Sequence, residues 1–247
     1  MNDSSSESGR SRLAVILAVV LVPLAALVAV YLLFFNEDSP DKLTLSDPPA
    51  TQPDSGGTGT GTDTDATLAG TWKIASGSVA GYRVREKLAA LPATSDAVAR
   101  TDSVAGSITV RTEGSNLVAD GVDVEVDVAS LKSDPPESRR DNRIKTQGLE
   151  SDLFPSATFT STGPVTLPSG TAAGEAIKAE VTGDLTIHGV TKAVTIPLDV
   201  RLTGNQGEVV GSLKFPFSDF GMTPPSVGGF VTVESDATIE FKLLLTR

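Results

Sequence analysis

Cysteine is absent from the 247-residue sequence, and histidine occurs once, as His188. Without cysteine the chain has no thiolate nucleophile, disulfide, iron–sulfur cluster or cysteine-based zinc site. A single histidine excludes a metal site built on two histidines of one chain. Basic residues are outnumbered, because 20 Lys and Arg stand against 31 Asp and Glu, which gives a formal net charge of −11. This balance argues against a nucleic-acid partner, which needs a basic surface. We therefore predict no metal, no cofactor and no nucleic acid.

One long apolar run occupies residues 13–35 (LAVILAVVLVPLAALVAVYLLFF) and contains no charged residue. As a helix it would span about 34 Å, which is enough for the hydrocarbon core of a bilayer. Arg10 and Arg12 precede the run, and an acidic stretch follows it. The positive-inside rule therefore predicts that residues 1–12 form a cytoplasmic tail and that the rest of the chain is extracytoplasmic. The alternative is a cleaved signal peptide, but such a peptide has a shorter apolar run and a small-residue cleavage site.

Residues 36–69 are rich in Asp, Pro, Gly, Ser and Thr. This composition cannot bury a core and predicts a disordered linker. A flexible chain of that length has a root-mean-square span of roughly 30 Å and a maximal reach of about 110 Å. The remaining residues, 70–247, have the length of one domain.

Alternation of apolar and polar residues dominates this domain. The apolar positions of the four clearest segments are Val122, Val124, Val126 and Val128; Ile177, Ala179, Val181, Leu185 and Ile187; Val194, Ile196, Leu198, Val200 and Leu202; and Ile239, Phe241, Leu243 and Leu245. A period of two with one apolar face is typical of half-buried antiparallel strands. Further strands are predicted over 78–87, 104–112, 157–165 and 208–217. About eight strands with turn signals between them predict a barrel or a sandwich.

One segment, SDPPESRRDNRIKTQG, breaks the alternation. Asp134, Pro135 and Glu137 form a capping arrangement that predicts a short helix beginning at this point. Ile144 and Gly148 would lie at its far end. We expect this helix to lie across one end of a barrel.

Four stretches of the domain, in order, resemble the YceI-like family of extracytoplasmic polyisoprenoid-binding barrels. They are GTWKIASGSVAGYRVRE, VEVDVASLKSDPPESRRDNRIKTQGLESDLFPSATFTST, VTGDLTIHGVTKAVTIPLDV and FPFSDFGMTPPSVGGFVTVESDATIEFKL. Two departures concern the ligand: Gly77 stands where many relatives have His before Ser, and the usual aromatic pair before Pro155 is missing. The resemblance implies an extended, antiparallel, lipocalin-like β-barrel that holds a long isoprenoid chain or a quinone-like amphiphile.

Strand phase assigns the lining of such a barrel. The predicted cavity residues are Val124, Val126, Phe159, Ile187, Ile196, Leu198, Phe215, Phe217 and Phe241. Other phenylalanines, Phe154, Phe220 and Phe230, either line the cavity or fill the core. Arg140 and Asp141 are candidate contacts for a polar head group, although solvated helix charges would look the same. Trp72 is interpreted as a plug of the barrel.

No residue is predicted to be catalytic. His188 follows a strand on its polar side and precedes Gly189, so we interpret it as a turn residue that bonds backbone groups rather than as a base or metal ligand. Asp184 is the nearest acid in the strand and equally suits the surface. Asp219 lies in a DFG tripeptide, but no other kinase motif accompanies it, so a turn position is predicted.

The leading functional hypothesis is therefore a membrane-tethered extracytoplasmic protein, not an enzyme, that carries or buffers a polyisoprenoid lipid. Two alternatives stay open. One is a filled barrel that serves as a cell-surface interaction domain without a ligand. The other is an enzyme that acts on an isoprenoid lipid, which would need polar groups gathered inside the barrel.

Overall fold

The computed structural model describes residues 39–47, 68–88, 94–114, 116–167, 174–227 and 231–247. The predicted cytoplasmic tail (1–12) and membrane anchor (13–35) lie outside the described residues. Within those described ranges, no helix has both the length and the apolar character needed to cross a membrane.

Strands make up most of the described chain, with one α-helix and two short 3-10 helices. In chain order the elements are β1 (Gly70–Ile74), β2 (Val79–Leu88), β3 (Thr94–Thr101), β4 (Val104–Glu113), β5 (Asn116–Asp127), η2 (Val128–Ser130), β6 (Lys132–Asp134), α2 (Ser138–Thr146), β7 (Ser156–Ser161), β8 (Val165–Leu167), β9 (Ile177–Ile187), β10 (Val190–Thr203), β11 (Gln206–Pro216), η3 (Phe217–Phe220), β12 (Ser226–Val227) and β13 (Val231–Thr246).

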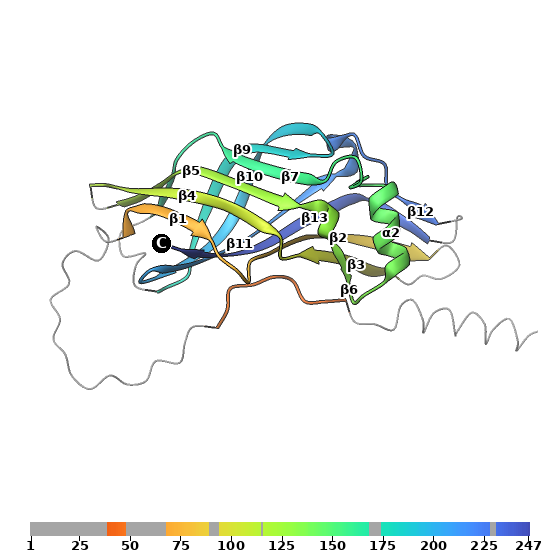
Figure 1. Ribbon diagram of the computed structural model, residues 1–247, viewed down its shortest axis with the longest axis horizontal. Helices are drawn as coiled ribbons and strands as arrows, with labels where there is room; N and C mark the ends of the chain where they lie inside the picture. Colours follow the sequence, from red (N-terminus) through yellow and green to blue (C-terminus); the bar gives the residue numbers. More distant parts are fainter. Residues whose placement is uncertain (1–38, 48–67, 89–93, 115, 168–173, 228–230) are drawn as a thin grey trace, which may run out of the picture. The chain divides into compact units, whose positions relative to one another are not determined.

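The strands form one antiparallel sheet that closes on itself (Figure 1). Neighbours around the ring follow the order β1-β4-β5-β7-β9-β10-β11-β13, and β13 pairs back with β1. Three further strands extend this wall, because β2 pairs with β13, β3 with β2, and β6 with β3. The predicted fold is thus confirmed as an eight-stranded closed antiparallel barrel with one helix.

The alternating strands turn their apolar faces inward, as strand phase predicts. In β9, Val181, Gly183, Leu185 and Ile187 are buried, while the polar residues that alternate with them are more exposed. The inward residues of β5 change from odd-numbered positions at its start (Leu117 and Ala119) to even-numbered positions at its end (Val122, Val124 and Val126). A regular strand could not keep both sets on one face, so β5 needs a bulge between them. Gly121 supplies the bulge with a φ of 59°, where the β4–β5 register shifts. A positive φ suits glycine, so the whole strand keeps one apolar face.

The helix begins later than its sequence predicts. Glu137 is the N-cap, and its side chain accepts a hydrogen bond from the Arg139 amide at 2.8 Å. Asp134, the predicted cap, instead ends β6, and its carboxylate lies 3.3 Å from the Arg100 guanidinium. The predicted cap at Asp134 is therefore wrong, because Asp134 pairs with β3 as the last residue of strand β6. The helix does lie at one end of the barrel, as expected (Figure 1).

The segment predicted as a disordered linker, 36–69, includes two parts that contact the barrel. Residues 39–47 lie along its outer wall and form hydrogen bonds with the five strands β2, β3, β10, β11 and β13, for example from Ser39 to Asp96 and from Ser46 to Glu208. Leu68 is 2% exposed and belongs to the core. The expectation of one free tether over 36–69 is therefore wrong for 39–47 and for Leu68. The polar composition of 39–47 does not reveal its contacts with a charged wall.

Candidate functional site

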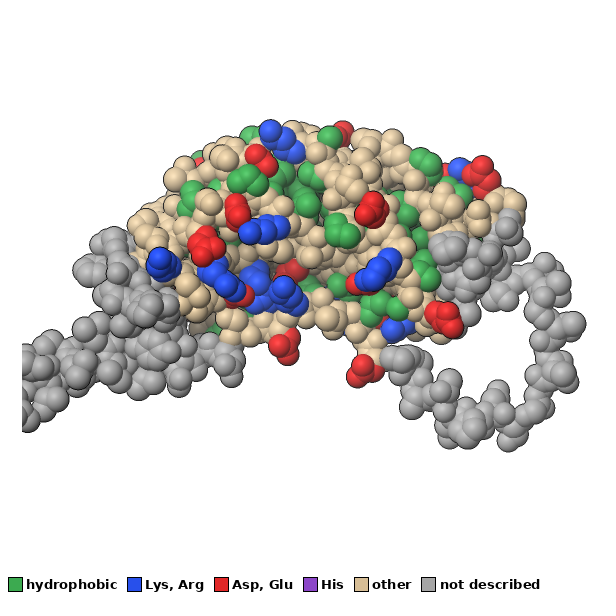
Figure 2. Space-filling model, turned by 180° about the vertical axis from the view of Figure 1, so that it is seen from behind, with side chains coloured by type: hydrophobic (Ala, Val, Ile, Leu, Met, Phe, Trp, Pro, Cys, Tyr) green, Lys and Arg blue, Asp and Glu red, His purple; other side chains and the backbone are tan. Residues whose placement is uncertain are grey.

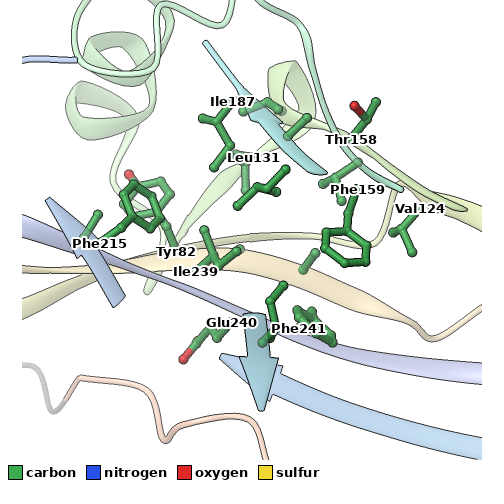
Figure 3. A pocket seen from close by; sticks show the side chains of 18 of the residues that line it. Tyr82, Val124, Leu131, Thr158, Phe159, Ile187, Phe215, Ile239, Glu240 and Phe241 are labelled. Carbon is green, nitrogen blue, oxygen red and sulfur yellow. The ribbon is translucent and has the colours of Figure 1, made fainter. Parts of the chain in front are cut away.

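A cavity of about 260 Å³ runs inside the barrel. Its walls are mainly Val, Leu, Ile, Phe and Ala side chains from strands all around the ring. Figure 3 shows such side chains converging on one space, with Phe159 and Phe241 on one side and Tyr82 and Phe215 on the other. The cavity is therefore a site for an apolar molecule rather than for an ion.

All the residues predicted from strand phase lie on this cavity. These are Val124, Val126, Phe159, Ile187, Ile196, Leu198, Phe215, Phe217 and Phe241. Their contact with a ligand stays a prediction. Strand phase missed the lining residues contributed by β2 and β3, among them Tyr82, Val84 and Ala97. The apolar residues of β2 alternate with charged ones at Arg83 and Arg85, a signal that could have identified its inner face.

Several inward side chains are only half-buried. Val124, Leu198 and Phe241 share their strand faces with fully buried residues, yet each keeps accessible surface. Because they point into the barrel, this accessible surface faces the cavity. The core is thus close-packed in places and open along these residues, unlike a barrel filled throughout by its own side chains.

Two inward glycines make room for aromatic rings in the wall. A Cβ on Gly183 of β9 would lie 2.5 Å from Cζ of Phe159, and one on Gly211 of β11 would collide with the ring of Phe241. The rings therefore lie over the glycine backbone of neighbouring strands. Any larger residue at these two positions would have to push a ring toward the cavity.

Trp72 of β1 lines the apolar space. β1 and α2 lie toward opposite ends of the barrel (Figure 1). Its side chain is 1% exposed and its indole N–H donates to the carbonyl of Leu68 at 2.9 Å. This donor is satisfied inside the core, so the indole needs no contact with a ligand. The arrangement agrees with the interpretation of Trp72 as a plug.

Polar groups gather at the α2 end of the cavity. Glu86 of β2 and Arg140 of α2 form an ion pair with 3.3 Å between Oε2 and Nη2. Arg143 of α2 and its C-cap Gln147 line the same cavity, as does Tyr82 of β2. Burial raises the pKa of the Tyr82 phenol, and the nearby Arg140 charge only partly opposes this effect. Tyr82 thus stays neutral and available as a hydrogen-bonding group.

The two predicted head-group residues differ in position. Arg140 lines the cavity, whereas Asp141 is not among its lining residues. The Asp141 carboxylate accepts a hydrogen bond from the Ser133 amide at 2.8 Å. Asp141 therefore fastens α2 to β6 and positions Arg140 instead of facing the cavity.

The remaining aromatic residues have separate roles. Phe220 is 1% exposed and packs edge-on against Phe215 with 4.8 Å between ring centroids. Phe154 lies outside the barrel core, against His188. Phe230 lies outside the described residues. Asp219 is exposed in η3, in agreement with a turn position.

His188 occupies the two-residue turn between β9 and β10. Its φ of 53° and that of Gly189 at 71° are both positive, as a type I′ hairpin requires. Its Nε2 lies 2.7 Å from a carboxylate oxygen of Glu150, and its ring packs on Phe154 with 4.3 Å between centroids. The predicted bonds to turn backbone are thus replaced by a carboxylate partner 38 residues away. His188 does not line the cavity.

Comparisons with known proteins agree with this geometry. The model of a family described as a YceI-like domain matches residues 72–245. A UPF0312 protein of Vibrio parahaemolyticus is 35% identical over 132 residues, which cover 51% of this chain and 64% of that protein. A UPF0312 protein of Vibrio vulnificus is 32% identical over 126 residues, covering 48% and 62%. The aligned part thus spans slightly less than two thirds of these relatives.

A solved structure has the same fold. It is described as a polyisoprenoid binding domain from Saccharophagus degradans implicated in plant cell wall breakdown. It is 18% identical, has a TM-score of 0.50, and the match covers 72% of this chain and 98% of that one. At this identity the similarity concerns the fold.

Proposed function

Because this chain belongs to the family of YceI-like domains, we propose that its barrel binds a polyisoprenoid or a similar long-chain amphiphilic lipid. The tail would lie in the apolar cavity between β5, β9, β10 and β13. The head group would lie at the α2 end, near Arg140, Arg143 and Gln147. The protein would act as a carrier or buffer of such a lipid and not as an enzyme.

The observation that carries this proposal is the uneven distribution of polar groups along the cavity. Apolar side chains line most of its length, and the charged lining residues other than Glu240 belong to the α2 end. Glu240 comes from β13, but its carboxylate bonds to Arg100 at 2.8 Å and points away from the space (Figure 3). An amphiphile with one polar end and one long apolar end matches this distribution.

Release of the lipid is as important for a carrier as its capture. Burial of an apolar tail stabilises the complex by about 25 cal/mol per Å² relative to water. A bilayer offers the tail a similar apolar environment, so the net preference for the barrel over the membrane is small. Such a balance suits exchange with a membrane and does not suit permanent storage.

The proposal includes an extracytoplasmic location on an N-terminal anchor. Its support is the charge asymmetry around residues 13–35, with Arg10 and Arg12 before the apolar run and acidic residues after it. The barrel would then lie on the same side of the membrane as the linker, beside the lipid that it binds.

The arrangement of polar groups favours binding over catalysis. The charged lining residues Glu86 and Arg140 already form a pair, and the His188–Glu150 pair lies away from the cavity lining. The enzyme hypothesis therefore gains no support from the described residues.

Extraction of the purified full-length chain tests the proposal. Organic solvent should release a lipid with a long apolar tail at about one molecule per chain, identified by mass spectrometry. An Arg140→Gln chain separates binding of the lipid tail from recognition of its head group. We expect this variant to keep tail binding but to lose preference for anionic head groups. A chain that carries no lipid and takes up none from vesicles would contradict the proposal.

A further inference from the structure

Segment 39–47, here called the strap, crosses the outer wall of the barrel and is bound mainly through its backbone. The carbonyl of Pro40 accepts from Arg83 at 2.6 Å, and that of Asp41 accepts from Arg100. Further along, the carbonyl of Thr44 accepts from Lys242 at 3.1 Å. The strap thus meets cations from β2, β3 and β13 in succession.

The two serines of the strap add side-chain bonds at its ends. Ser39 Oγ donates to the carbonyl of Asp96 at 3.0 Å and accepts from its amide at 3.1 Å. At the other end, the Ser46 amide and hydroxyl both donate to a Glu208 carboxylate oxygen at 2.9 Å. The Ser46 carbonyl accepts from Arg201 of β10. Both ends of the strap are therefore fixed to the wall.

The wall beneath the strap is organised by its own ion pairs. Glu240, which is 4% exposed, pairs with Arg100 at 2.8 Å and with Arg83 at 3.5 Å. Glu208 pairs with Lys242 at 2.7 Å. These acids hold the cations in place before the strap arrives, so docking costs little side-chain entropy. The N–H groups of these cations can donate hydrogen bonds to carbonyl oxygens, which an extended peptide presents along its backbone.

The charges on this molecule are mixed in sign. Acidic and basic side chains lie close together on the face that Figure 2 shows, without a large region of one sign. Such a surface has little affinity for an anionic membrane as a whole. A specific extended segment is a better partner for Arg83, Arg100, Arg201 and Lys242 than a lipid surface. Leu43 and Leu45 of the strap are half-buried.

We propose that the strap is an intramolecular docking segment. While it is docked, most of the linker no longer contributes to the length of the tether between the anchor and the barrel. This inference rests on the membrane anchor of the proposed function. With the strap docked, residues 36–38 connect an anchor ending at residue 35 to the barrel wall. With the strap released, the connection is the whole of 36–67. The two states differ in maximal reach by roughly tenfold, about 10 Å against about 110 Å.

The functional consequence is control over where the barrel can exchange lipid. A docked strap keeps the barrel at the membrane surface, where a lipid tail can move from bilayer to cavity. A released strap lets the barrel travel from the membrane while it stays attached. Substitutions in the strap would therefore change the reach of the barrel without changing its cavity.

The first arm of the test measures docking directly. In the full-length chain, hydrogen exchange of the amides in 39–47 should be at least about tenfold slower than in a free peptide, equivalent to about 1.4 kcal/mol. Ser39→Ala combined with Ser46→Pro removes both side-chain anchors and the Ser46 amide, so protection should be lost. Thr44→Ala is the matched control, because Thr44 contributes only its carbonyl. Exchange at the free-peptide rate in the unmodified chain would overturn the proposal.

The second arm measures reach, and the absence of native cysteine makes it direct. An Asn205→Cys chain, labelled at this exposed turn with a donor dye, is placed in vesicles of phosphatidylcholine that contain an acceptor lipid. Energy transfer should fall at least about twofold in the strap-release variant and remain unchanged in Thr44→Ala. Equal transfer in both variants would overturn the proposed control of reach even if the strap is docked.

Failure of the strap proposal can be separated from failure of lipid binding. Lipid extracted from the same chains should be equal in both strap variants, because neither substitution touches the cavity. Absence of lipid in every chain would count against the binding function and not against docking. A chain that does not associate with vesicles at all would overturn the anchor and, with it, the control of reach.

Discussion

His188 shows how one residue can hold two distant segments together. The Glu150 carboxylate bonds its ring, and Phe154 packs against the same ring, so the segment after α2 is pinned to the β9–β10 turn. Glu150 itself has a φ of 46°, which is uncommon outside glycine and asparagine. The contacts of His188 therefore maintain the local course of the chain near the helix end of the cavity.

Replacement of this ring should affect stability more than binding. We expect His188→Ala to lower the free energy of unfolding by about 1–2 kcal/mol, the scale of a lost side-chain hydrogen bond, and to leave lipid uptake nearly unchanged. His188→Asn is the matched variant, because asparagine tolerates the positive φ but lacks the ring. Urea unfolding gives the free energy. Loss of uptake without a loss of stability would show that His188 acts on the ligand.

The helix α2 and the strap cover two different parts of the barrel. α2 covers one end of the cavity and supplies Arg140 and Arg143 to its lining, while the strap covers cations on the outer wall. Each depends on a few polar contacts at its ends. Glu137 caps the start of the helix, and Glu208 accepts a hydrogen bond from Ser46 near the end of the strap.

Glu137 offers a test of the observed helix start. Glu137→Ala should cost about 1 kcal/mol of stability, because it leaves the first amides of α2 without their acceptor. Ser138→Ala is the control, one residue further and exposed. The two variants are compared by thermal unfolding. Equal stability of both would place the cap elsewhere, for instance at Asp134.

The contacts of Glu208 make docking of the strap depend on pH. Burial alone would raise the pKa of this carboxyl, but hydrogen bonds from Lys242 and Ser46 outweigh it and hold the pKa below its ordinary value. Arg201 at 3.8 Å adds a further positive charge. A lowered pKa contributes stability above the ordinary glutamate value of about 4.3, and that stability is lost as the pH falls through the lowered value.

Hydrogen exchange of the strap should therefore be slow at pH 6 and accelerate below about pH 4, after correction for the intrinsic rate. The barrel amides in β9 and β10 serve as the internal reference. A Glu208→Gln chain should lose this acid dependence, since glutamine does not titrate. Strap protection in the unmodified chain with the same acid dependence as in the Glu208→Gln chain would contradict the role of the ionised Glu208.

At the scale of the whole molecule, the charged residues that α2 and β2 contribute to the cavity lie at one end of the barrel, and mainly apolar residues line the rest. This asymmetry gives a bound amphiphile a direction. The proposed location, in addition, puts the barrel outside the cytoplasm.

Protease added to the outside of wall-free cells should shorten the chain by cutting between 36 and 69. Protection of the whole domain, with cleavage seen only after lysis, would reverse the predicted topology.

Much of this arrangement could be predicted because alternation is a local property of each strand. The inward faces of β9, β10 and β13 follow from it directly. The sequence does not show which distant residue meets a given side chain, so Glu150 was missed as the partner of His188. The same holds for the strap, whose polar residues look free until the cations of four separate strands are brought together by the barrel. Asp134 was misassigned because pairing with β3 outweighs a local capping pattern.

The central claim, a hollow barrel that binds a lipid tail, is tested most directly by filling the cavity. Val124 lies opposite Phe159 and faces the open space, whereas its neighbour Glu125 is exposed on the outer surface. Uptake of a fluorescent polyprenyl analogue is measured for the full-length chain, for Val124→Phe and for Glu125→Phe. We predict that uptake falls at least about tenfold in Val124→Phe alone, with a melting temperature that holds or rises, because the added ring occupies ligand space. No uptake by the unmodified chain, together with a loss of about 1–3 kcal/mol of stability in Val124→Phe, would show a filled core and contradict the account.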